Sequence, residues 1–181
     1  MVLNTPGNPT GVVYPREVLQ QIAALAQEQD FLVLSDEVYE KLIYGGAQHV
    51  SIASPDGMKE LTIPINGFSK AFAMTGWRMG YLAADARLIL PMLKVHQYAV
   101  ASSNIIAQSA AITALQAGES CVEEMRREYA RRRQFLLDAF AQIPEISCVA
   151  PAGTFYIYPN ISGTGLSGTE FADKFLMEAG V

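Results

Sequence analysis

The length of 181 residues predicts one domain, or one domain and part of a second, and the composition, 50% hydrophobic and 17% charged, is sufficient for a packed core. The formal net charge of −5 argues against a nucleic-acid partner, because nucleic-acid binding needs a basic face. No apolar run approaches the ~20 residues of a membrane helix and the amino terminus does not resemble a signal peptide, so we expect a cytoplasmic protein with no membrane partner.

The first part of the chain alternates predicted strands with a helix. Residues 2–3 have the character of the end of a strand, and a turn-rich loop over residues 4–11 follows it. Apolar residues at helical spacing then predict a helix from Pro15 to about Gln29. Further strands are predicted at residues 31–35, 61–66 and 81–84. Pro64 favours an edge position or a bulge for the strand that contains it.

The second part of the chain is mostly helical by its pattern. Helices are predicted at residues 86–98, 104–117 and 122–140, with Asp85 as the cap of the first and Gly118 at the end of the second. Two strands, at residues 147–149 and 155–158, and a last helix that opens at Ser167 complete the prediction. The change from helices to two strands predicts a domain over residues 1–125 and a second, smaller one over residues 126–181.

Strands that alternate with helices predict an α/β fold with a mostly parallel sheet. In an open parallel sheet, ligands bind at the carboxyl ends of the strands. Three polar side chains follow predicted strands at this position: Asn8, Asp36 and Lys70. We therefore expect them to converge on one crevice although they lie far apart in the sequence.

The residue types in this crevice suit a cofactor with an aldehyde, a phosphate and an electron-accepting ring. Lys70 lies in a loop of small residues, and Arg78 follows it eight positions later. The lysine amine suits a Schiff base with the aldehyde, and the guanidinium suits the phosphate. Asp36 is the candidate for keeping a ring nitrogen protonated. Tyr39 and Asn8 are the candidate donors to a phenolic oxygen on the ring.

Three segments, in this order, resemble the consecutive motifs of class I/II aminotransferases of fold type I. They are Asn8-Pro9-Thr10-Gly11, Ser35-Asp36-Glu37-Val38-Tyr39, and the block from Ser69-Lys70 to Gly76-Trp77-Arg78-Met79-Gly80. Residues 151–156 are similar to the start of a strand in the family's small domain. The sequence of the segment around Lys70 is most similar to that of the prokaryotic aspartate/aromatic aminotransferases. The resemblance implies part of the large domain of a fold type I enzyme, followed by the beginning of a smaller α+β domain.

This resemblance implies a pyridoxal 5'-phosphate (PLP) enzyme that moves an amino group from an L-amino acid to a 2-oxo acid. The route is ping-pong, with Lys70 as the catalytic Schiff-base lysine and general base and acid. Asn8, Asp36, Tyr39, Lys70 and Arg78 are the implied cofactor-binding residues, and no metal is implied. The whole protein is implied to be a homodimer.

The chain also departs from the family pattern. Gly67 stands where the family often has a phosphate-binding hydroxyl, and Thr154 stands where alanine is common. Family members are about twice as long, and the additional segments carry a phosphate-binding helix terminus, an aromatic that stacks on the ring, and the arginine for the substrate carboxylate. We therefore expect a partial chain that has little activity alone.

Other interpretations remain open at this stage. Taken singly, Asn8 fits an ordinary turn, Asp36 a helix cap and Tyr39 a core position. A PLP-dependent C–S lyase or a synthase would use the same cofactor contacts, and a truncated chain can also be a non-catalytic remnant. Four isolated side chains are expected to be structural: Cys121, Cys148, His49 and His96.

Overall fold

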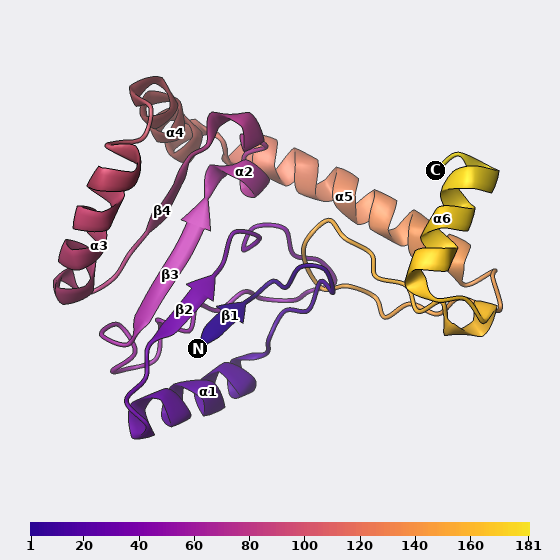
Figure 1. Ribbon diagram of the computed structural model, residues 1–181, viewed down its shortest axis with the longest axis horizontal. Helices are drawn as coiled ribbons and strands as arrows, with labels where there is room; N and C mark the ends of the chain where they lie inside the picture. The colour runs from indigo at the N-terminus through magenta and orange to yellow at the C-terminus, as the bar shows by residue number, and fades with distance from the viewer.

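The computed structural model describes residues 1–181 and contains one four-stranded sheet with helices around it (Figure 1). The strands lie in the order of the chain: β1 (Val2–Asn4), β2 (Val33–Asp36), β3 (Thr62–Gly67) and β4 (Gly80–Leu82). The first three are parallel and β4 is antiparallel to β3. The prediction of a mostly parallel α/β sheet is confirmed.

Six α-helices accompany the sheet. They are α1 (Arg16–Glu28), α2 (Phe68–Ala71), α3 (Ala86–Val100), α4 (Ile105–Ala117), α5 (Glu119–Phe140) and α6 (Gly168–Ala179). Two short 3-10 helices are η1 (Thr75–Trp77) and η2 (Ser162–Thr164). The predicted caps are present, because the Asp85 carboxylate accepts a hydrogen bond from the Arg87 amide and Ser167 forms a capping box with Glu170. None of these helices combines the length and the apolar character that crossing a bilayer requires.

The best-packed part of the molecule lies between α1 and the first two strands. Leu19, Ala23 and Ala26 are the buried residues of α1, and their spacing places them on one face of the helix. They form a cluster with Leu3 of β1, Val33 of β2, and two residues of the following loop, Ile52 and Met58. This core fixes β1 and β2 relative to each other, and so fixes the loops that leave their carboxyl ends.

Pro64 lies in an interior strand, which corrects the expectation of an edge or a bulge. β3 pairs with β2 on one side and with β4 on the other. The Leu61 carbonyl accepts from Val33 of β2, and the Ile65 carbonyl accepts from Glu37 directly after β2. The backbone groups of Pro64 therefore face β4, and its carbonyl accepts from Ala83. The proline is tolerated because the β4 ladder begins only at Ile65, paired with Leu82, so the missing N–H falls just beyond its end.

The two strands predicted in the last third of the chain are wrong. Residues 147–149 and 155–158 contain no strand, and only the single bridge between Ser147 and Asn160 joins this region to itself. A second bridge joins Gly153 to Ile43. Neither bridge extends into a ladder of paired residues. The aromatic residues 155 and 156, which lie between them, pack against the ring of Tyr39 instead.

The helix α5 continues without interruption past residue 126, where the sequence predicts a new domain. Figure 1 shows it running from the vicinity of α2 and α4 to the region of α6, at the other end of the molecule. The division into residues 1–125 and 126–181 stays a prediction.

Candidate active site

The carboxyl ends of three parallel strands place Asn8, Asp36 and Lys70 at one edge of the sheet. Asn4 of β1 pairs with Asp36 of β2, and Asp36 pairs with Ile65 of β3. Asp36 is the last residue of β2, and Lys70 belongs to α2, which starts immediately after β3. The arrows of β1, β2 and β3 point the same way in Figure 1, and the loops after them gather at that end.

Lys70 places its ammonium group against two aromatic rings. Its Nζ lies 5.7 Å from the centre of the Tyr39 ring and 5.1 Å from the centre of the Phe155 ring. No carboxylate lies within salt-bridge distance of it in residues 1–181. A cation held over ring faces without an acidic partner remains able to react at its nitrogen once it loses a proton.

Tyr39 is 3% exposed, and its hydroxyl donates a hydrogen bond of 3.1 Å to the hydroxyl of Tyr156. Burial is the main cause that raises the pKa of the Tyr39 phenol well above its ordinary value, followed by the hydrogen bond to Tyr156. The negative charge of Asp36 acts in the same direction. The phenol is therefore a proton-bearing donor at neutral pH.

Asp36 is half-buried and held by the loop after β1. One carboxylate oxygen, Oδ1, accepts from the Val38 amide at 3.3 Å. The Asp36 carbonyl accepts from the Thr5 amide at 3.1 Å and from Asn4 Nδ2 at 3.2 Å. These backbone contacts fix the residue and leave Oδ2 without a donor from the chain, so this oxygen can accept a hydrogen bond from a ligand.

Asn8 is connected to the same cluster from the other side. The backbone amide of Asn8 donates to Asn4 Oδ1 at 2.7 Å, and this hydrogen bond closes the loop after β1. Asn8 Nδ2 lies 3.5 Å from the Tyr156 hydroxyl, at the long end of the hydrogen-bonding range. Asn8 and Tyr39 thus approach the same hydroxyl group.

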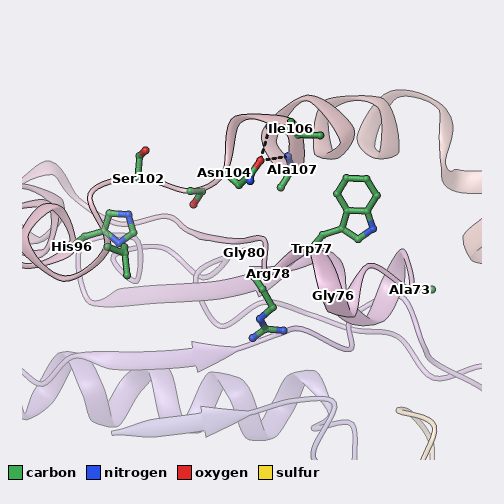
Figure 2. Close-up of a pocket in the computed structure, with 12 residues that line it drawn as sticks. Ala73, Gly76, Trp77, Arg78, Gly80, His96, Ser102, Asn104, Ile106 and Ala107 are labelled. Atoms are coloured by element: carbon green, nitrogen blue, oxygen red, sulfur yellow. Dashed lines mark hydrogen bonds between the residues drawn. The ribbon is translucent and has the colours of Figure 1, made fainter.

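Arg78 is exposed and has left-handed backbone angles, φ 52° and ψ 48°. Its Nη1 donates to the Thr75 carbonyl at 2.7 Å, and it makes no direct hydrogen bond or ion pair with the other four predicted residues. In Figure 2 the guanidinium and the Trp77 ring point in opposite directions. Both residues border an open hollow of about 820 Å³ that does not include Lys70. Lys70, Tyr39 and Asn8 are instead connected through Phe155 and Tyr156, and this side-chain cluster, which does not include Arg78, is the candidate site.

Two residues of the cluster, Phe155 and Tyr156, were not predicted from the sequence as site residues. Phe155 provides the second ring against Lys70, and Tyr156 provides the hydroxyl between Tyr39 and Asn8. Both lie in the segment that resembles a family motif, but its expected role was structural. Phe155 and Tyr156 are adjacent aromatics directly after a Gly-Thr turn, and this is the one signal in the sequence that could have indicated them.

A buried hydrogen-bond network supports the segment that carries Tyr39. Glu37 is buried and accepts hydrogen bonds from the Ser35 and Ser51 hydroxyls at 2.8 and 2.7 Å. Its other carboxylate oxygen lies 3.1 Å from His49 Nε2. Burial alone would raise the pKa of Glu37, but the hydrogen bonds from His49 and the two serines outweigh this effect and lower it.

The lowered pKa of Glu37 predicts a loss of stability in acid. Because the folded-state pKa lies below the ordinary value of 4.5, the stabilisation is complete above about pH 4.5 and is lost as the pH falls through the folded-state value. The substitution Glu37→Gln should remove this dependence. Urea unfolding of both proteins at several pH values measures it. We expect their free energies of unfolding to converge as the pH falls, whereas Glu28→Gln, at an exposed position of α1, should follow the wild type.

The sequence is similar to known proteins over its whole length. The family model described as aminotransferase class I and II matches residues 1–181. An aromatic-amino-acid aminotransferase 2 of Thermococcus litoralis is 46% identical and an aspartate aminotransferase of Pyrococcus abyssi is 47% identical, each over 100% of this chain and 47% of the relative. The chain spans about half the length of these curated relatives.

The fold agrees with the sequence comparison. The crystal structure of an aromatic aminotransferase from Pyrococcus horikoshii OT3 superimposes with a TM-score of 0.95 and 46% sequence identity. This match covers 98% of the present chain and 48% of that structure. Lys70 after β3 and Asp36 at the end of β2 belong to a fold that this solved aminotransferase shares, and the chain belongs to the class I and II aminotransferase family.

Proposed function

We infer that the whole protein is a PLP-dependent aminotransferase that moves an amino group from an L-amino acid to a 2-oxo acid, with Lys70 as the reactive amine. One observation carries this inference: the Lys70 ammonium has no acidic partner, lies over two rings, and follows β3, which pairs with the strand that ends at Asp36. The names of the relatives, aspartate and aromatic-amino-acid aminotransferases, support the same substrate class.

The donor set fits PLP. Lys70 supplies a primary amine for the aldehyde, and Asp36 has one carboxylate oxygen that accepts no hydrogen bond from the chain. Arg78 has a guanidinium without a carboxylate partner, which suits a phosphate. Tyr39 bears its proton at neutral pH and Asn8 has an amide donor, which together suit an anionic oxygen on the ring.

Each residue has a distinct task in this proposal. When bound, the cofactor ring accepts electrons from the bond that breaks at the substrate Cα. Asp36 would hold a proton on the ring nitrogen, and Tyr39 and Asn8 would donate to the ring oxygen. The free Lys70 amine would take the proton from the substrate Cα as a general base and deliver it to the cofactor carbon as a general acid. Arg78 would orient the phosphate.

Reductive labelling tests the position of the reactive amine. The protein is incubated with PLP, reduced with borohydride and digested, and the labelled peptide is identified by mass spectrometry. We expect the label on Lys70. A label confined to another lysine, such as exposed Lys59, would overturn the assignment.

Product analysis tests the reaction class on the whole protein. Amino-group transfer requires a 2-oxo acid as acceptor, whereas elimination from the same amino acid does not. We expect no turnover until 2-oxoglutarate or another 2-oxo acid is added, and parallel initial-rate lines for the two substrates, as ping-pong kinetics require. Release of ammonia without an oxo acid would favour a lyase.

The oligomeric state of the whole protein belongs to the same proposal. The helices α3 and α4 expose large apolar side chains, among them Val95, Tyr98 and Ile105. We propose that the whole protein is a homodimer, in keeping with the family resemblance. Light scattering during size-exclusion chromatography of the full-length protein should give twice the mass of one subunit, and a single-subunit mass would contradict it.

A further inference from the structure

The Tyr156 hydroxyl lies between two residues that the proposed function assigns to the cofactor. It accepts the hydrogen bond of 3.1 Å from Tyr39 and lies 3.5 Å from Asn8 Nδ2. The two tyrosine rings also meet edge to face, with their centres 6.0 Å apart. No predicted role explains this convergence of three side chains from three separate segments.

The backbone that carries Tyr156 is held in an unfavourable conformation by specific contacts. Thr154 is 1% exposed and has φ 66°, in the left-handed region that a β-branched residue rarely adopts. Its amide donates to the Leu42 carbonyl at 2.8 Å, and its Oγ1 accepts from the Tyr156 amide at 3.1 Å. Such strain persists only where surrounding contacts enforce it. The direction of Tyr156 is therefore a fixed feature of the fold.

Each of the two phenols has one hydroxyl proton to donate, and this limits the hydrogen bonds that Tyr156 can form. Tyr39 has one hydroxyl proton, and in the structure it donates this proton to Tyr156. If Tyr39 donates to a ligand instead, its oxygen becomes free to accept the proton of Tyr156 over the same short distance. A hydroxyl that accepts a hydrogen bond is polarised and becomes a better donor.

We propose that Tyr156 is a positioning residue for the cofactor site, whose hydroxyl holds Tyr39 and Asn8 in place and donates to Tyr39 when Tyr39 donates to the cofactor. This inference rests on the proposed function, because it assigns Tyr39 to the ring oxygen. Tyr156 itself need not touch cofactor or substrate. Its effect passes through Tyr39 and, over the longer contact, through Asn8.

A double-mutant cycle that uses cofactor capture as its readout tests this role. The quantity measured is the PLP concentration that gives half-maximal borohydride labelling of Lys70, which requires no turnover. We expect Tyr156→Phe to raise this concentration about 3- to 10-fold, the range for the loss of one hydrogen bond. In the Tyr39→Phe background the same substitution should change it less than about 2-fold, because the partner hydroxyl is already absent.

Tyr158→Phe is the matched control, since Tyr158 is 63% exposed and two residues from Tyr156, and it should leave the concentration unchanged. Lys70 labelling in the wild type together with an unchanged Tyr156→Phe protein would overturn this inference and leave the proposed function standing. An equal effect in both backgrounds would also overturn it, because a general structural defect does not depend on Tyr39. Failure to label Lys70 in the wild type would overturn the proposed function and this inference with it.

Discussion

Replacing Lys70 by arginine is expected to abolish covalent capture of PLP at this position. Arginine keeps the positive charge and can remain over the Tyr39 and Phe155 rings, but its guanidinium stays protonated and is not a nucleophile at neutral pH. In the whole protein, the loss of the general base and acid should lower the rate of amino transfer by about 10²- to 10⁴-fold or more. Borohydride labelling and initial rates measure the two effects.

The Lys70 experiment needs a control for folding and for charge. Lys59→Arg, on an exposed loop, makes the same chemical change away from the site and should leave labelling and rate unchanged. Thermal unfolding of both variants should remain close to the wild type, since neither substitution removes a buried apolar group. A Lys70→Arg protein with a rate within about threefold of the wild type would exclude Lys70 as the catalytic amine.

Truncating Leu42 to alanine is expected to lower the free energy of unfolding by about 2–5 kcal/mol, the range for large-to-small changes in a packed core. Leu42 is 0% exposed and lies three residues after Tyr39. Its carbonyl accepts from the Thr154 amide, so the residue joins the segment of Tyr39 to that of Tyr156. Since domains are stable by only about 5–15 kcal/mol, such a loss is a large part of the total. Urea unfolding monitored by circular dichroism measures it.

Leu25→Ala provides the comparison for Leu42. Leu25 lies on α1 and is 50% exposed, so the same truncation removes less buried surface and should cost less than about 1 kcal/mol. Equal losses at the two positions would show that burial does not control stability in this region. A loss at Leu42 below that at Leu25 would contradict the packing described here.

The elements with a strong local pattern could be predicted from the sequence. The helix α1 has its buried apolar residues on one face, and the short apolar runs at residues 31–34 and 63–65 contribute to β2 and β3. Ligands of parallel sheets bind at the carboxyl ends of the strands. The common location of the residues at the ends of the three parallel strands follows from this general property. This is why Asp36 and Lys70 are expected in one place, and the structure shows that Asp36 ends β2 while Lys70 follows its neighbour β3.

The elements that depend on distant partners could not be predicted. The segment 155–158 has the aromatic and β-branched composition of a strand, but its backbone joins no ladder, and the rings of Phe155 and Tyr156 pack on Tyr39 instead. The expectation of an edge or a bulge at Pro64 is wrong, because the sequence pattern does not reveal that the ladder with β4 begins only at Ile65. The short helices α2 and η1 are too brief to have a period of their own.

For the candidate site, too, the sequence motifs indicate some features, whereas others depend on the packing of the chain. Asn8, Asp36, Tyr39, Lys70 and Arg78 each stand in a short motif whose residue types indicate a task, and these tasks stay predictions. The contact between Tyr39 and Tyr156 could not be predicted, because these residues are 117 positions apart and meet only when the strained turn at Thr154 packs against Leu42. Local sequence governs backbone conformation over a few residues, whereas the meeting of distant side chains is settled by the packing of the whole chain.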